Sequence, residues 1–159
     1  MDPLLRLLKN GARASTGDLA GQLNLTEEEI AGRIAEFEKQ GVILGYHAVF
    51  DPEKIGDSIV TAVIEVKIVP ERGGGFDRLA SRIAKFEQVQ SCYLMSGGYD
   101  LLVIVEGLNL QAVAAFIAEK LSTIKGVLST STHFRLKTYK ENGAMLRRPE
   151  REERLAVAP

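Results

Sequence analysis

The sequence predicts an α+β fold in which three short helices precede a domain of mixed strands and helices. Two observations carry this prediction. Apolar residues recur at helical spacing over the first 45 residues, and from Ile59 onward a two-residue alternation replaces that spacing until it returns further along. With 159 residues, 45% of them hydrophobic, the chain is long enough for one ordinary domain or two small ones.

The first 45 residues predict three helices joined by tight turns. A leucine-rich first helix begins at Leu4 and is ended by Gly11. A second helix spans Asp18–Leu23, with Ser15 and Thr16 in front of it as capping candidates. Short helices with turns this tight are typical of a helix-turn-helix.

The third helix has the clearest signals. Thr26 followed by Glu29 predicts a capping box, in which the hydroxyl and the carboxylate each accept from a free backbone N–H group. Gly41 is suited to end the helix. The buried stripe of this helix is expected to consist of Ile30, Ile34 and Phe37.

The segment after this helix predicts a connection between two domains. Residues 42–50 are rich in β-forming side chains and predict a connecting strand, which Asp51-Pro52 ends in a turn. We therefore expect a helix-turn-helix domain at residues 1–45, a connecting strand and linker at 46–57, and a second domain at 58–138. The charged tail at 139–159 is expected to lack regular structure or to form a short exposed helix.

The second domain predicts the element order β-α-β-β-α-β. This order is the ferredoxin-like arrangement, an antiparallel sheet with both helices on one face. One strand is apolar on both of its faces, so we expect the uncovered face of the sheet to pack against a second copy in a dimer. The expected elements are Ile59–Ile68, Phe76–Phe86, Val89–Met95, Leu101–Val105 (the apolar strand), Leu110–Ile124 and Val127–Leu136.

Composition excludes several classes of protein. Low aromatic content, 26% charged residues and a net charge of −1 exclude collagen-like, disordered and disulfide-rich chains. The single cysteine, Cys92, cannot form an internal disulfide and fits a reducing compartment. No cluster has metal-ligand spacing, and no apolar stretch approaches the roughly 20 residues of a membrane span. We therefore expect a cytoplasmic protein with no metal, no cofactor and no membrane partner.

The ordered set of motifs resembles the leucine-responsive/asparagine (Lrp/AsnC, feast/famine) family of transcriptional regulators over about residues 4–140. The resemblance implies a DNA-binding regulator that forms homodimers, often four in an octameric ring, and senses an amino acid or related metabolite at its oligomer interfaces. The residues that carry it are Ala12-Arg13, Asp18-Leu19-Ala20, Arg33-Ile34, Glu38, Gly41-Val42-Ile43, Gly45-Tyr46, Asp51-Pro52, Gly56, Gly98-Tyr99-Asp100, Lys120-Leu121, Gly126-Val127, Thr130 and Thr132.

The resemblance implies that the first domain binds double-stranded DNA. The exposed face of the third helix is poor in the Arg, Lys, Asn and Gln side chains that read base edges, and its glutamates repel phosphates. Residues 1–45 carry five basic and seven acidic groups, and only the tail is basic. An alternative is therefore an Lrp-like protein that senses a ligand, binds DNA weakly or not at all, and acts through a partner. Candidate DNA-binding residues are Arg13, Thr26, Glu28, Arg33 and Lys39.

The glycine-containing segment before the Leu101–Val105 strand is the best candidate for an effector site. Two glycines allow backbone N–H groups to approach a carboxylate, and Asp100 is suited to an α-ammonium group, although a plain hairpin turn also explains the glycines. In the family, the last strand of a neighbouring dimer completes the pocket, which corresponds here to Ser129, Thr130 and Thr132. The candidate effector-binding residues are Ser96, Gly97, Gly98, Tyr99, Asp100, Thr130 and Thr132.

An enzymatic function is a third possibility, because some proteins of this architecture are haem-pathway decarboxylases that use histidines. His47 and His133 lie in expected strands, with no cysteine, serine nucleophile or paired carboxylate in a recognisable motif beside them. Exposed strand histidines explain them better, so we expect no catalytic residues.

Overall fold

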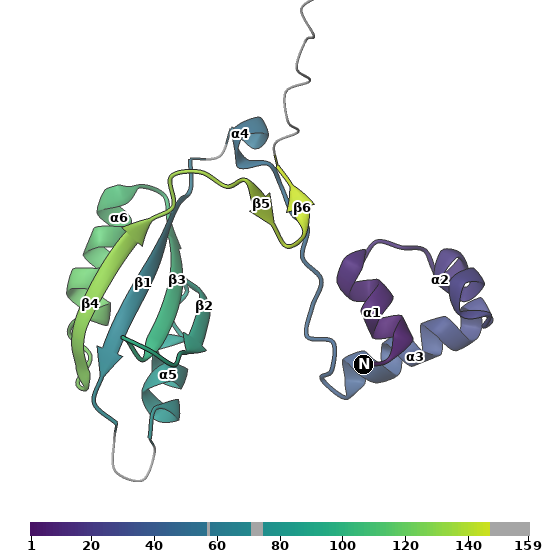
Figure 1. The fold of residues 1–159 in the computed structure, drawn as a ribbon, viewed down its shortest axis with the longest axis horizontal. Coiled ribbons are helices and arrows are strands. Elements are labelled where there is room, and N and C mark those ends of the chain that lie inside the picture. Colours follow the sequence, from purple (N-terminus) through teal and green to yellow (C-terminus); the bar gives the residue numbers. More distant parts are fainter. Residues whose placement is uncertain (57, 71–74, 147–159) are drawn as a thin grey trace, which may run out of the picture. The chain divides into compact units, whose positions relative to one another are not determined.

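The computed structural model of the chain describes residues 1–56, 58–70 and 75–146 (Figure 1). It divides into two compact units. Of the described residues, the first contains Met1–Phe50 and Lys140–Leu146, and the second contains those between Asp51 and Tyr139.

Three helices build the first unit, as predicted: α1 (Pro3–Asn10), α2 (Thr16–Leu23) and α3 (Glu27–Lys39). The side chain before each of the first two helices caps it. Asp2 Oδ1 accepts from the Leu4 N–H at 2.8 Å, and Ser15 Oγ accepts from the Asp18 N–H at 3.0 Å.

Both ends of α3 have the predicted geometry. The Glu29 N–H donates to Thr26 Oγ1 at 3.2 Å, and the Thr26 N–H donates to Glu29 Oε2 at 2.8 Å. At the other end Gly41 adopts a φ of +68°, and the Val42 N–H donates to the Phe37 carbonyl at 2.8 Å. These bonds satisfy backbone groups that a helix end leaves free.

The turn between α2 and α3 consists of residues 24–26 and brings the two helices into contact. Asn24 has a φ of 52°, in the left-handed region that asparagine tolerates better than most residues. A tight turn between two packed helices is the geometry of a helix-turn-helix. The small core beneath consists of Leu4, Leu8, Leu19, Ala20 and Ile30, with Ile34 and Phe37 half-buried at its edge.

The predicted connecting strand does not form, and this prediction is wrong for the single chain. A strand requires a neighbour that accepts and donates its backbone hydrogen bonds, and residues 42–50 have none within the part of the chain that the structure describes. Their apolar side chains are largely exposed, with Leu44 at 93%. The expected turn at Asp51-Pro52 is a single helical turn, α4 (Pro52–Ile55).

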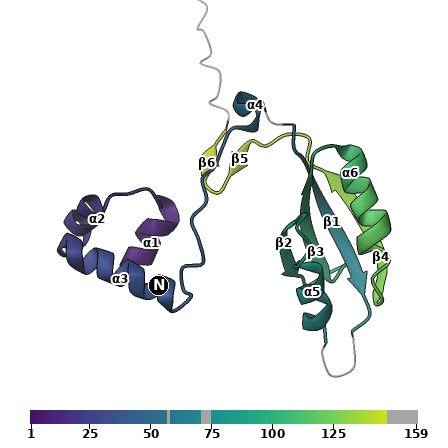
Figure 2. The same cartoon turned by 180° about the vertical axis from the view of Figure 1, so that it is seen from behind.

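The second unit has the predicted ferredoxin-like topology. Its sheet has the order β2-β3-β1-β4 with antiparallel neighbours, and its helices cover one face (Figure 2). The elements are β1 (Val60–Ile68), α5 (Asp77–Ile83), β2 (Val89–Leu94), β3 (Leu101–Gly107), α6 (Leu110–Ala115) continuing into the π-helical η1 (Phe116–Leu121), and β4 (Val127–Phe134).

The last helix ends at Leu121, earlier than the predicted Ile124. The Thr123 hydroxyl donates to the carbonyls of Glu119 and Lys120 at 2.9 and 3.0 Å, and so takes acceptors that a longer helix would use. The core between helices and sheet consists of Ala62, Ile64, Val66, Ile68, Leu79, Ile83, Leu101, Val103, Val105, Val113, Phe116, Leu121 and Ile124.

The other face of the sheet is uncovered, as Figure 1 shows. Register places Val63 beside Ile104, and Leu102 beside Tyr93. Tyr93 is 50% exposed, and the other three side chains are half-buried. This face therefore has an apolar centre.

The prediction for the tail is wrong at residues 140–146. Strands β5 (Lys140–Glu141) and β6 (Ala144–Met145) pair as a hairpin around Asn142 and Gly143, whose φ values are 44° and 88°. Asn-Gly favours this turn because both central positions need positive φ. The prediction for the tail was based on its charge and its lack of periodicity, and it did not take the Asn-Gly pair into account. The tail expected at residues 147–159 lies outside the described residues.

Candidate effector site and DNA-binding helices

The predicted effector segment joins β2 to β3. Its last residue, Asp100, is fixed by three hydrogen bonds. The Met95 N–H donates to its carbonyl at 2.8 Å, its own N–H donates to the Val66 carbonyl at 3.0 Å, and its Oδ2 accepts from the Ile68 N–H at 2.8 Å. The Asp100 carboxylate therefore holds the turn against β1.

A cavity of about 310 Å³ lies beside this turn. Of the candidate effector residues, the structure brings Gly98, Tyr99 and Thr130 together at this cavity. Ser96, Gly97, Asp100 and Thr132 are not among its lining residues. The lining consists of Glu65, Lys67, Gly98, Tyr99, Ser129, Thr130 and Ser131.

Strand register explains which side chains of β4 face the cavity. Ser129 pairs with Lys67 and Ser131 pairs with Glu65, so these four side chains lie on the uncovered face of the sheet. Thr130 and Thr132 pair with Val66 and Ile64, which are buried beneath the helices. Their hydroxyls therefore belong to the opposite face.

Sequence reasoning missed Glu65, Lys67 and Ser131 as lining residues. A usable signal existed for the serine, because residues two apart in a strand share a face and Ser129 was already considered. No local signal identified the other two. Their proximity to the glycine turn depends on the pairing of strands distant in sequence.

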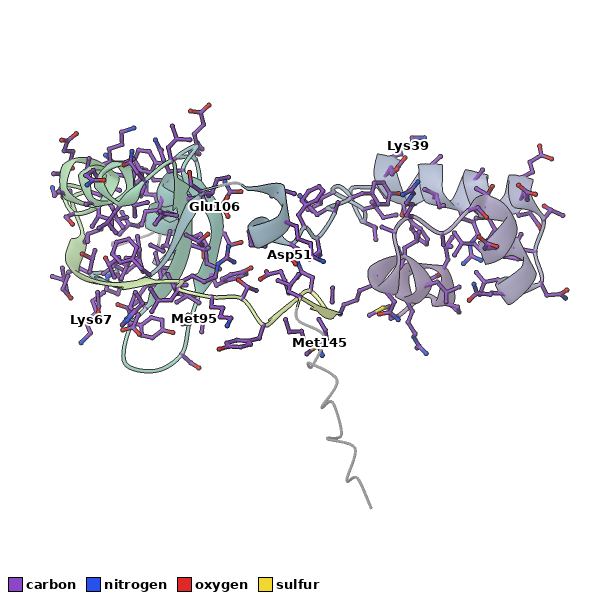
Figure 3. The ribbon with its side chains drawn as sticks, turned by 90° about the horizontal axis from the view of Figure 1, so that it is seen from above. Lys39, Asp51, Lys67, Met95, Glu106 and Met145 are labelled. Carbon is purple, nitrogen blue, oxygen red and sulfur yellow. The ribbon has the colours of Figure 1, made fainter. Side chains whose placement is uncertain are left out.

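Two side chains of opposite charge, Glu65 and Lys67, line the cavity. Glu65 Oε1 lies 3.5 Å from His133 Nε2, and Ser131 Oγ lies 3.4 Å from the same ring nitrogen. Lys67 forms no ion pair with any other residue that the structure describes. Figure 3 shows Lys67 on the side of the sheet away from α6. The cavity thus presents an anionic and a cationic side chain on one strand.

The two glycines of the turn have different backbone requirements. Gly97 has a φ of +138°, a conformation that side chains rarely adopt. Gly98 has no positive φ, and a Cβ added to it would meet nothing within 4 Å apart from its chain neighbours. Neither backbone conformation nor packing within the chain requires glycine at position 98. Close approach of a ligand to its N–H group would require it.

A second cavity, of about 460 Å³, contains none of the candidate residues. It lies where β1 begins and β3 ends, between apolar and acidic side chains. Its lining consists of Ile59, Glu87, Gln88, Glu106, Gly107, Leu108 and Ala112.

Some of the candidate DNA-binding side chains of the helix-turn-helix are already engaged in contacts within the chain, and others are exposed. Arg33 forms an ion pair with Asp2, with 2.6 Å between its nitrogen and the carboxylate oxygen. Thr26 uses its hydroxyl in the capping box. Arg13, Glu28 and Lys39 are exposed, and Figure 3 shows Lys39 projecting from α3.

The start of α3 is strongly acidic. The Thr26 backbone N–H and hydroxyl donate to Glu29 and lower the pKa of its carboxyl below the ordinary value of 4.5. Glu27 accepts from the Thr16 hydroxyl at 3.0 Å, and Glu28 is exposed. Three carboxylates thus surround the end of the helix that enters the major groove in a helix-turn-helix.

Residues 61–145 match the Lrp/AsnC ligand binding domain. Over 157 residues the chain is 41% identical to YugG, an uncharacterized HTH-type transcriptional regulator of Bacillus subtilis, covering 98% of this chain and 95% of that protein. The chain belongs to the Lrp/AsnC family. It is a helix-turn-helix transcriptional regulator, and its second unit is the ligand-binding domain of that family.

Two further proteins are similar to this chain. The HTH-type transcriptional regulator FL11 of Pyrococcus horikoshii is 31% identical over 138 residues, covering 87% of this chain and 88% of that relative. The fold is similar to that of the transcriptional regulator NMB0573 of Neisseria meningitidis, solved in complex with L-Met. The TM-score is 0.68 at 23% identity, over 89% of this chain and 93% of that one.

The Lrp/AsnC ligand-binding domain contains the whole lining of the smaller cavity, since Glu65 and Ser131 are the first and last residues of that lining. No group of three or more His, Cys, Asp or Glu side chains within residues 1–56, 58–70 and 75–146 could hold a metal ion. No helix among these residues is long and apolar enough to cross a membrane.

Proposed function

We propose that this Lrp/AsnC regulator binds an amino acid in the cavity at Gly98 and thereby changes its affinity for DNA. The observation that carries the proposal is the meeting of a glycine turn with Glu65 and Lys67 at one small cavity. A free amino acid carries one positive and one negative charge. A turn N–H and a lysine suit the carboxylate, and a glutamate suits the ammonium.

Oligomers link this site to DNA. The uncovered sheet face, with Leu102 and Ile104 at its centre, forms a homodimer, and four dimers form an octamer. A neighbouring dimer closes the open side of the cavity. An amino acid bound there stabilises one assembly over another and so alters how paired helix-turn-helix units span their operator.

The test is a fluorescence anisotropy titration of labelled double-stranded DNA from upstream of the regulator's own gene. It is run at low and moderate salt, with and without a mixture of the common amino acids. We expect specific submicromolar binding at moderate salt and a shift of the binding curve by at least one amino acid. Binding that no amino acid changes would contradict the effector part of the proposal.

The acidic start of α3 favours a second candidate function, that of a ligand sensor that binds DNA only with a partner. Glu27 and Glu28 repel phosphates, and Arg33 is already paired with Asp2. If charge limits DNA binding, the double variant Glu27→Gln, Glu28→Gln will bind DNA more tightly, and Arg13→Ala and Lys39→Ala will bind more weakly. If the double variant binds no better, charge at this helix is not the obstacle.

The proposed regulator has no catalytic function, and its histidines act as polar strand residues. Ser131 Oγ and Glu65 Oε1 both lie beside the same ring nitrogen of His133, Nε2, at 3.4 and 3.5 Å. A catalytic triad needs the nucleophile at one ring nitrogen and the carboxylate at the other, so this contact is not a triad. Because its relatives come from bacteria and archaea and its target is DNA, its place of action is the cytoplasm.

A further inference from the structure

We propose that the cavity at Gly98 selects small amino acids with polar side chains, of the hydroxyl or amide class, over branched aliphatic ones. Glu65 holds the α-ammonium group, and Lys67 holds the α-carboxylate. This inference rests on the proposed function, because it names the class of effector for the same cavity.

The size of the cavity limits the ligand. Its volume of about 310 Å³ lies at the lower end of the range of roughly 300–1,000 Å³ typical of small-molecule sites. A single small amino acid fits such a volume.

The side chains at the cavity are mostly polar. Ser129 and Ser131 face it from β4, directly opposite Lys67 and Glu65. The Tyr99 ring is the only large apolar surface among the lining residues. An aliphatic side chain would gain little apolar contact here and would strip water from two serine hydroxyls without replacing the lost hydrogen bonds. A hydroxyl or amide side chain replaces them.

The anionic Glu65 and the cationic Lys67 occupy separate positions on the same face of β1. Lys67 is free of ion pairs among the described residues and stands on the same strand face as Glu65, two residues away. The Gly98 N–H lies in the turn that lines the same cavity, where no Cβ blocks approach. The carboxylate of the ligand therefore belongs at Lys67 and Gly98, and the ammonium group belongs at Glu65.

The polarity of the ligand is tested by isothermal titration calorimetry of the full chain with L-Ser, L-Thr, L-Asn, L-Gln, L-Leu and L-Val. We expect at least one of the four polar amino acids to bind about tenfold or more tightly than L-Leu and L-Val. If L-Leu or L-Val binds as tightly as the polar amino acids, the inference is wrong while the proposed function stands. If none of the common amino acids binds or shifts DNA affinity, the proposed function fails as well.

Variants test the two charge roles. Glu65→Gln and Lys67→Gln are each expected to weaken binding of the preferred amino acid by about tenfold or more, because each removes one charge-assisted contact. Glu87→Gln and Lys125→Gln carry the same charge changes at exposed positions outside the cavity and serve as controls. Unchanged affinity in either cavity variant overturns the charge assignment.

A third variant separates side-chain selection from charge recognition. The double change Ser129→Ala, Ser131→Ala is expected to reduce the preference for the polar amino acid over L-Leu to about threefold or less, with the sites for both ligand charges kept. Ser122→Ala, exposed beyond the end of η1, is the control. A full preference in the double variant overturns the selection by hydroxyl groups. Thermal unfolding checks that each variant is folded.

Discussion

At the scale of single residues, neighbouring glycines in one turn have separate causes. Gly97 occupies a φ of +138°, which makes glycine a requirement of the backbone. Gly98 has neither positive φ nor a steric restriction within the chain. The first glycine therefore serves folding, and our proposal gives the second a role in admitting the ligand.

Alanine substitutions separate these two roles. Gly97→Ala is expected to lower the free energy of unfolding by about 1–3 kcal/mol, because it forces a side chain into a sparsely populated conformation. Gly98→Ala is expected to leave stability nearly unchanged and to weaken amino-acid binding. Urea unfolding and calorimetric titration measure the two effects. Equal loss of stability in both variants would contradict this division of roles.

Asp2 makes two contacts of different kinds. Its Oδ1 caps α1 through the Leu4 N–H, and its Oδ2 pairs with Arg33 on α3. Asp2→Asn keeps a good cap and loses the ion pair, which costs about 1 kcal/mol or less between these half-buried side chains. Asp2→Ala loses both, with a further cost of about 1 kcal/mol. Urea unfolding of the helical signal compares them. Identical midpoints for these variants would show that the cap contributes nothing.

At the scale of elements, the capping box makes the first turn of α3 sensitive to acid. The folded-state pKa of Glu29 lies below its ordinary value of 4.5, so the bond to Thr26 stabilises the helix fully above that value. Its contribution disappears as the pH falls through the folded-state pKa, because protonation removes the charged acceptor.

Glutamine at position 29 tests this pH dependence. Glu29→Gln keeps the hydrogen-bonding geometry of a capping box and cannot titrate. We expect its helical circular dichroism signal to decline less than that of the unmodified chain as the pH is lowered from about 6 to about 3. Glu28→Gln, which lacks this hydrogen bond, is the matched control. The same acid response in all three proteins would refute the role of the box.

At the scale of the whole molecule, the uncovered sheet face sets the proposed assembly. We expect Ile104→Glu to convert the dimer into a folded monomer, since it places a charge in the apolar centre of that face. Leu136→Glu adds the same charge at a position that is 95% exposed and is expected to leave the dimer intact. Sedimentation velocity measures both masses. A dimer that survives Ile104→Glu would place the interface elsewhere.

An element of the fold could be predicted where the residues that determine it lie close together in the sequence. The three helices, the caps of α2 and α3 and the βαββαβ order were predictable because each depends on residues within about one helical turn or one strand. The prediction failed over residues 42–50, which have the composition of a strand without a neighbour in the single chain. It also failed at Asn142-Gly143, where a local hairpin signal was available and was overlooked.

The candidate site was only partly predictable for the same reason. The glycine turn could be identified from its own residues, as could the polar last strand. The roles of Glu65 and Lys67 could not, because they depend on the register that aligns these residues with Ser131 and Ser129. Arg33 likewise gave no local sign of its pairing with Asp2.

The sequence by itself determined the fold class, the ends of α3 and the family of this regulator, because the backbone groups at the ends of α3 are satisfied by residues close in the chain. Only the tertiary structure decided which side chains share the cavity. Cross-strand register assigns each residue of β4 to one face or the other, and it placed Ser131 rather than Thr132 beside Glu65. A difference of one residue in a strand changes the face of a side chain, and here it determines the chemistry that a ligand meets.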